Sequence, residues 1–123
     1  MNEKLLSLAP FLHIHCGWLP DYRGSTTIYY SILKEKMCGV SAILLNEGID
    51  TGKIVAKEKY PIPPKDMNID YVYDSIIRAD LLVKVLKSRE KWVPVRQSEN
   101  GTTYYVIHPI LKHLAYVKVE KND

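Results

Sequence analysis

The sequence predicts an α/β protein with a mixed sheet, flanking helices and a C-terminal hairpin. Residues 40–45 form a nearly continuous apolar run, which is typical of a strand buried on both faces. Residues 68–89 carry apolar side chains at helical spacing. The predicted order is strand, helix, strand, strand, helix and hairpin, which is typical of the α/β class. With 123 residues, the chain has the size of one domain, residues 1–123.

Composition excludes several classes of protein. Apolar residues make up 46% of the chain, too many for a disordered protein. The net charge of +3 is too weak to indicate a nucleic-acid partner. No apolar run approaches the roughly 18 residues of a membrane span, and the N-terminus lacks the apolar core of a signal peptide. The two cysteines, Cys16 and Cys38, cannot form a disulfide framework, so we expect reduced thiols in a cytoplasmic protein.

The first half of the chain alternates helix and strand. Residues 2–8 predict the end of a helix, and residues 11–15 predict a short strand. After a loop, Ser25 or Thr26 can cap a helix that runs to about residue 36. The apolar residues of this helix at helical spacing are Ile28, Tyr29, Ile32 and Leu33.

The second half predicts a strand, a long helix and a hairpin. Residues 53–62 form the strand, with three lysines that we interpret as a solvated face: Lys53, Lys57 and Lys59. The long helix over residues 68–89 is scaffold rather than a site. Its apolar stripe consists of Ile69, Val72, Ile76, Ala79, Val83 and Leu86. The Asn100-Gly101 step between residues 92–97 and 104–107 predicts the hairpin.

Two loops, residues 13–24 and 45–52, carry the residues suited to chemistry. Each follows a predicted strand, and ligands of α/β sheets bind at the carboxyl ends of strands. His13 and His15 are two apart on a strand, so they share a face. If the two strands are neighbours, Asp50 reaches that face and forms a proton-handling pair with a histidine.

Three other interpretations of these residues stay open at this point. His13, His15, Cys16 and Asp50 include the side-chain types that bind zinc, although no second Cys or His motif with metal spacing is present. Cys16 could be a nucleophile, but nothing in the sequence shows that it is activated. The two histidines could also be polar residues satisfied at the end of a strand.

Taken together, the two loops resemble the family of formyltransferases that use 10-formyltetrahydrofolate. The similarity covers residues 11–65 well and the long helix plausibly. The first family motif is matched by His15, Leu19, Pro20, Tyr22, Arg23 and Gly24. The second is matched by Glu47, Gly48, Asp50, Thr51 and Gly52. A combined match in this order is more specific than either loop alone.

The resemblance implies a role for each matched residue. His15 and Asp50 would be the catalytic histidine and aspartate, and His13 stands where the family has a catalytic asparagine. The residues implied at the formyl donor, 10-formyltetrahydrofolate, are Leu19, Pro20, Gly48 and Ile49. Those implied at the acceptor are Tyr22, Arg23 and Gly24, although for Arg23 we favour a structural role.

The acceptor implied by the resemblance is an amine, for example on a nucleotide sugar or on methionyl-tRNA. The roughly 30 residues after the long helix are too few for a tRNA-binding barrel, which favours a small acceptor.

The sequence departs from the family in two further ways. Cys16-Gly17-Trp18 replaces the usual Pro-Ser-Leu, and about half of the Rossmann-like fold before the first motif is absent. We therefore expect a partial Rossmann-like formyltransferase fold, with an exposed strand edge that favours a homo-oligomer. The alternative to an active enzyme is an inactive remnant that serves as a binding or self-associating module.

Overall fold

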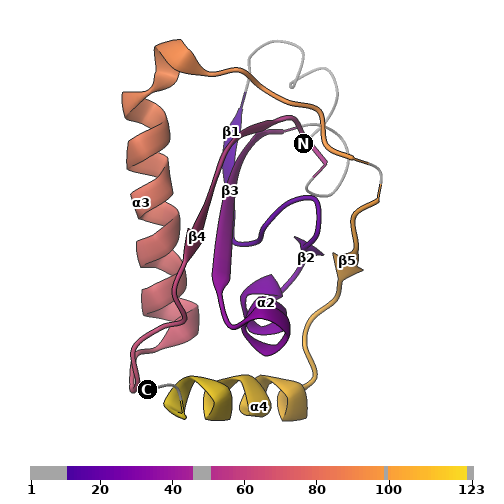
Figure 1. Cartoon of the computed structure of the whole chain (residues 1–123), viewed down its shortest axis with the longest axis vertical. Coiled ribbons are helices and arrows are strands. Elements are labelled where there is room, and N and C mark those ends of the chain that lie inside the picture. The colour runs from indigo at the N-terminus through magenta and orange to yellow at the C-terminus, as the bar shows by residue number, and fades with distance from the viewer. Residues whose placement is uncertain (1–10, 46–50, 99, 122–123) are drawn as a thin grey trace.

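A three-stranded antiparallel sheet forms the centre of the computed structural model, which describes residues 11–45, 51–98 and 100–121 (Figure 1). Its strands are β1 (Leu12–His15), β3 (Cys38–Leu44) and β4 (Ile54–Tyr60), in the order β1-β3-β4. All three strands were predicted from the sequence, and the described part of the fold is α/β. The helix predicted over residues 2–8 lies outside the described residues.

The C-terminal hairpin predicted from Asn100-Gly101 is wrong. Strand β5 (Thr103–Tyr104) instead pairs in parallel with β2 (Arg23–Gly24). Val95 forms an isolated antiparallel bridge with Ile54 of β4. The turn signal is local, whereas these pairings join segments that are far apart in the sequence. Because the structure contains both parallel and antiparallel pairs, the predicted mixed strand pairing is confirmed.

Among the described residues, helices α2 (Thr27–Glu35) and α3 (Asp74–Lys87) pack against the sheet and α4 (Pro109–Glu120) packs against α2 (Figure 1). Helix α2 follows the first loop, and α3 runs along one face of the sheet after a π-helical turn, η1 (Ile69–Tyr73). A short 3₁₀ turn, η2 (Arg89–Lys91), follows α3. None of the helices described is long and apolar enough to cross a bilayer.

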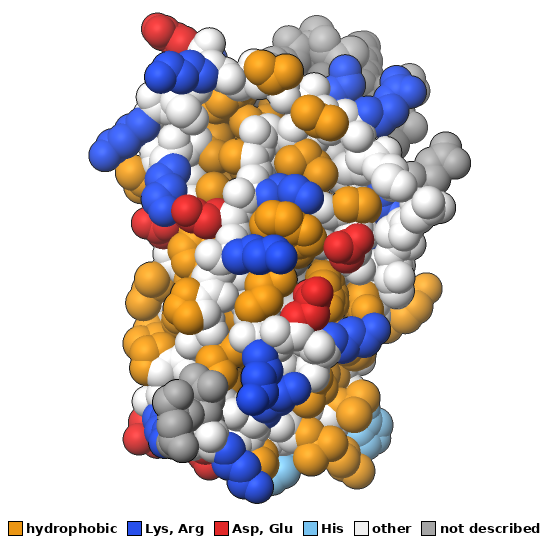
Figure 2. Space-filling model, viewed as in Figure 1, with side chains coloured by type: hydrophobic (Ala, Val, Ile, Leu, Met, Phe, Trp, Pro, Cys, Tyr) orange, Lys and Arg blue, Asp and Glu red, His pale blue; other side chains and the backbone are white. Residues whose placement is uncertain are grey.

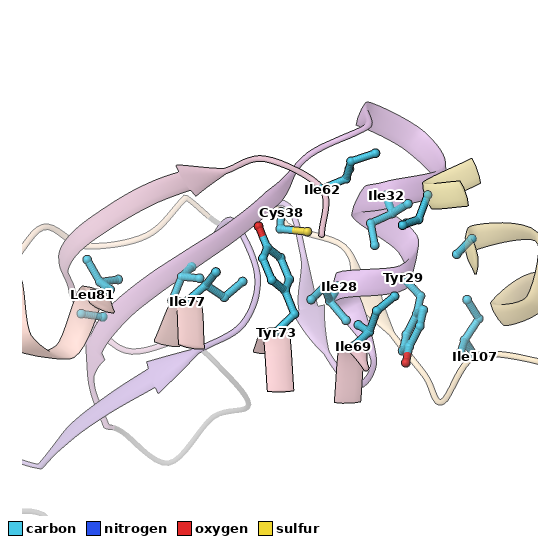
Figure 3. Close-up of a cluster of buried hydrophobic side chains, with 14 of the residues drawn as sticks. Ile28, Tyr29, Ile32, Cys38, Ile62, Ile69, Tyr73, Ile77, Leu81 and Ile107 are labelled. Atoms are coloured by element: carbon cyan, nitrogen blue, oxygen red, sulfur yellow. The ribbon is translucent and has the colours of Figure 1, made fainter. Parts of the chain in front are cut away.

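The core lies between α2, α3 and one face of β3 (Figure 3). The predicted stripe of α2 is confirmed, because Ile28, Tyr29 and Ile32 are buried. The predicted stripe of α3 is largely wrong. The buried residues of α3 are Ile77, Leu81 and Val85, which follow the buried Ile69 and Tyr73 of η1. The other predicted stripe residues, Val72, Ile76, Ala79, Val83 and Leu86, are exposed.

The π-helical turn explains this difference. In η1 the Tyr73 N–H donates to Asn68 O, five residues back, and the Asp74 N–H donates to Ile69 O. A π turn contains one residue more than an α turn, so it shifts the phase of the helix that follows. Ile69 therefore shares the buried face with Tyr73 and Ile77 rather than with Val72 and Ile76.

Charged side chains are spread over the face of the molecule shown in Figure 2. On the face in Figure 2, Lys and Arg side chains are interspersed with hydrophobic and acidic ones and do not form one continuous basic patch. A nucleic-acid footprint requires basic residues clustered on one face. This side of the molecule therefore gives no support to such a partner.

Candidate active site

His13 and His15 share one face of β1, as predicted from their spacing. Leu12, Ile14 and Cys16 pack against the core, so the alternating histidines lie on the opposite side of the strand. The centroids of the two imidazole rings are 6.5 Å apart, and the rings are tilted by 34°. His15 is buried, with only 7% of its surface exposed.

The imidazole of His15 is held by the backbone of the loop that follows it. Its Nε2 lies 2.7 Å from the carbonyl oxygen of Tyr22. A carbonyl can only accept a hydrogen bond, so Nε2 carries a proton. In the neutral ring Nδ1 is then the proton acceptor, and this assignment rests on the hydrogen-bond partner. The ring is therefore fixed in both orientation and tautomer, as a group that transfers protons requires.

The loop between His15 and Tyr22 is fastened to the sheet by a buried serine. Ser41 of β3 donates from Oγ to the Gly17 carbonyl at 2.6 Å and accepts from the Leu19 N–H at 3.0 Å. Leu19 is fully buried and is joined to Pro20 by a cis peptide bond. Leu19 therefore supports the loop from inside, and the half-buried Pro20 is the more accessible of the two.

We expect Ser41→Ala to cost about 1–3 kcal/mol of stability, because it leaves two buried backbone groups unpaired. The matched control is Ser31→Ala. Ser31 is equally buried but bonds only the Ile28 carbonyl of its own helix turn, so this change should be nearly neutral. Urea unfolding of both variants measures the difference. Equal losses would show that Ser41 does not fasten the loop.

Tyr22, Arg23 and Gly24 are built into the β2–β5 contact. The Arg23 guanidinium donates to Gln97 Oε1 at 3.1 and 3.3 Å and to the Ser98 carbonyl at 2.8 Å. Tyr22 is buried and stacks on Tyr104, and burial raises its pKa, with a further rise from the Glu35 carboxylate. Gly24 has φ +100°, and a Cβ there would meet Tyr104 O. The geometry thus supports the structural role favoured for Arg23.

The second loop is described only at its ends. Glu47, Gly48, Ile49 and Asp50 lie outside the described residues. On one side of them the Leu45 N–H donates to Phe11 O at 2.8 Å, and on the other the Lys53 carbonyl accepts from Leu44 N at 2.9 Å. The first end therefore lies beside the start of β1, and the second lies beside the end of β3, on its β4 side.

The two loops leave opposite ends of the β1–β3 pair. Strands β1 and β3 are neighbours, the condition set for Asp50 to reach the histidine face, but they are antiparallel, with Leu12 opposite Leu44 and His15 opposite Ser41. The first loop therefore leaves at the His15 end of this pair and the second at the Leu12 end. His13 is opposite Ile43, so it is closer in register to the second loop than His15 is.

Gln97 joins the two motifs, and sequence reasoning missed it. Its Oε1 accepts from Arg23 of the first motif, while its Nε2 donates to the Gly52 carbonyl of the second at 2.6 Å. Gln97 lies 45 residues from Gly52 and outside every recognisable motif. Nothing in its local sequence indicates this contact.

Cys16 is not suited to be a nucleophile here. Burial raises the pKa of its thiol well above the ordinary value, and the Asp74 carboxylate raises it further. The thiolate, which is the reactive form, is therefore disfavoured. As for zinc, the described ranges contain no group of three or more His, Cys, Asp or Glu residues that could hold a metal. Asp50, which the zinc interpretation includes, is outside those ranges.

A polar cavity of about 200 Å³ borders His15. It is lined by Cys16 and Thr27 and by the α3 pair Asp74 and Arg78, whose side chains form an ion pair. Cys16 and α3 lie on the core side of β1, so this pocket opens on that side, whereas the His15 imidazole lies on the opposite side of the strand with His13.

Comparison with known proteins identifies the family. The Formyl transferase family model matches residues 4–86, more than half of the chain, so the chain belongs to this family. A methionyl-tRNA formyltransferase of Wolbachia pipientis is 40% identical over 109 residues, covering 85% of this chain and 36% of the relative. One from Nitratiruptor is 33% identical over 107 residues, covering 85% and 35%. The chain thus spans about a third of the length of these relatives.

Solved structures agree on the fold. A methionyl-tRNA formyltransferase from Clostridium thermocellum superposes with a TM-score of 0.68 at 23% identity, covering 95% of this chain and 56% of the other. A sugar N-formyltransferase from Shewanella gives 0.69 at 23% identity, covering 94% and 54%. At this identity the likeness concerns the fold, and it confirms the predicted formyltransferase-type α/β architecture.

Proposed function

We propose that this chain transfers a formyl group from 10-formyltetrahydrofolate to an amine. The observation that carries the proposal is the buried His15, whose ring is fixed by the Tyr22 carbonyl within a motif of the formyl transferase family. Related folds support the donor class. A sugar 3N-formyltransferase was crystallised with 5-N-formyltetrahydrofolate and dTDP, and a Helicobacter canadensis N-formyltransferase with folinic acid and dTDP-3-aminofucose.

The described residues fit the reacting end of such a donor. His15 offers an imidazole that the Tyr22 carbonyl orients, on the face of β1 that it shares with His13. When bound, the folate supplies an activated formyl carbon. Pro20, at the half-buried surface of the first loop, is proposed to contact the donor together with Gly48 and Ile49.

The chain's own residues would manage protons and charge. As the amine forms a C–N bond to the formyl carbon, the carbonyl oxygen gains negative charge and requires donors that are already in place. His13 is proposed to donate to this charge from the position of the family's asparagine, and His15, beside it on the same face, to take part in proton transfer. Asp50 is proposed to take the proton that the amine loses. The intermediate then breaks the bond between the formyl carbon and N10 of the folate, and N10 gains a proton as tetrahydrofolate leaves. The acceptor is an amine on a nucleotide-linked sugar or on methionyl-tRNA, the two classes named for the relatives.

Two measurements test this function. Titration with 5-formyltetrahydrofolate should stabilise the chain by about 2.7 kcal/mol at 100 times the Kd. Incubation with 10-formyltetrahydrofolate and a panel of nucleotide-linked amino sugars and methionyl-tRNA should release tetrahydrofolate with at least one acceptor. Binding without turnover for every acceptor would contradict the proposed reaction.

The residue at position 13 favours a second candidate, an inactive remnant that only binds. An amide N–H donates at any pH, whereas an imidazole donates according to its tautomer and protonation. We expect His13→Asn to raise the rate of formyl transfer, because one oxyanion donor is worth about a hundredfold to a thousandfold. If the original chain and His13→Asn both bind folate but neither turns over, the remnant is the better description.

A further inference from the structure

Trp18 lies against Gly39 of β3, and two lysines of β4 lie over its indole ring. Its backbone and Cβ cross Gly39 so closely that a Cβ added at Gly39 would be 2.8 Å from the Trp18 Cβ. Lys57 Nζ is 4.1 Å from the centroid of the indole ring, and Lys59 Nζ is 4.8 Å away. Ammonium groups at these distances are attracted by the face of the ring.

The two lysines differ in what else they contact. Lys57 Nζ donates to the Leu19 carbonyl at 2.9 Å, and its side chain is half-buried. Burial lowers the pKa of the Lys57 ammonium group. The nearby Asp21 carboxylate raises that pKa and offsets part of the effect. Lys59 is exposed. The prediction that these lysines form a solvated face is therefore wrong for Lys57 and confirmed for Lys59.

Lys57 thereby reaches the backbone that orients the candidate catalytic histidine. Leu19 lies within the turn of residues 18–22, which is closed by a hydrogen bond from the Tyr22 N–H to the Trp18 carbonyl at 2.9 Å. The Tyr22 carbonyl at the end of this turn holds His15 Nε2. Lys57 contacts the turn at two points, the Trp18 ring and the Leu19 carbonyl.

We propose that Lys57 is a positioning residue for His15: it fixes the turn of residues 18–22, whose Tyr22 carbonyl orients the imidazole. Two neighbouring strands therefore hold this turn by hydrogen bonds to the Leu19 backbone: Ser41 of β3 accepts from its N–H, and Lys57 of β4 donates to its carbonyl. The catalytic consequence rests on the proposed formyl transfer. The structural consequence, a fixed His15 ring, does not depend on that function.

The experiment compares Lys57→Met with Lys59→Met in the full chain. Both changes remove an ammonium group above Trp18, but only the first removes the donor to Leu19 O. One readout is the exchange of the His15 Nε2 proton with solvent, followed by NMR. The other is kcat and KM for formyl transfer. Lys57→Arg serves as the rescue variant, because a guanidinium can both stack on an indole and donate to a carbonyl.

We expect Lys57→Met to speed the exchange of the His15 proton about tenfold or more, because the turn opens more often. We expect kcat to fall about tenfold or more with little change in KM, since misplacement of a catalytic group acts on the chemical step. Lys57→Arg should retain most of both properties, and Lys59→Met should resemble the original chain.

Exchange and kcat in Lys57→Met that match those of Lys59→Met would overturn the proposal. If Lys57→Met does not fold, Lys57→Gln is measured in the same way and should show the same direction of change. If no acceptor gives turnover in the original chain, the proposed function fails. The exchange comparison still decides whether Lys57 positions His15.

Discussion

Replacing His15 by alanine is expected to lower formyl transfer by about a hundredfold to ten-thousandfold, the range typical for loss of a proton-transferring side chain. The imidazole is a buried group that the Tyr22 carbonyl orients on the face shared with His13. Turnover of 10-formyltetrahydrofolate with the best acceptor from the panel measures the loss. The control is His113→Ala, because His113 is exposed on α4 and should leave the rate unchanged.

A second substitution separates the chemistry of His15 from its structural contact. The amide of His15→Gln can still donate to the Tyr22 carbonyl, but it cannot accept and release a proton near neutral pH. We therefore expect His15→Gln to keep the thermal stability of the original chain and to lose as much activity as His15→Ala. A glutamine variant with more than a tenth of the original rate would show that His15 acts by holding the loop.

Sequence reasoning identified the candidate site from the residue types that the proposed chemistry requires. The histidine pair, the Leu19-Pro20 turn and the family motif are short-range patterns, and period-two spacing correctly put His13 and His15 on one face. It did not find Gln97 or Lys57, whose partners lie 45 and 38 residues away. Such contacts depend on tertiary packing, and the sequence around a single glutamine or lysine carries no information about it.

The direction and partners of the strands also could not be predicted from local sequence patterns. The apolar run of β3 indicated a buried strand, and the structure confirms its burial. Burial on both faces is typical of parallel sheets but does not determine direction, and β1 and β4 are both antiparallel to β3. The Asn100-Gly101 step likewise signalled a turn, but the chain on either side pairs with β4 and β2 rather than with itself.

Helix α3 allows a direct test of the buried face seen in the structure against the stripe predicted from the sequence, because two adjacent isoleucines differ in burial. Ile77 is 2% exposed in the core, whereas Ile76 is 52% exposed on the stripe predicted from the sequence. We expect Ile77→Ala to cost about 2–5 kcal/mol, the range for truncating a buried isoleucine. Ile76→Ala should change stability by no more than about 0.5 kcal/mol, as is usual for surface positions.

Urea unfolding followed by circular dichroism measures both free energies of unfolding, at the same protein concentration for each variant. The pair Val85→Ala and Val83→Ala repeats the comparison further along the same helix, since Val85 is buried and Val83 is exposed. Alanine is also the better helix former, which lowers any cost at the exposed positions. A larger loss at Ile76 and Val83 than at Ile77 and Val85 would show that the helix faces the sheet with the stripe read from the sequence. It would also show that the π-helical turn at Ile69–Tyr73 does not set the phase of α3.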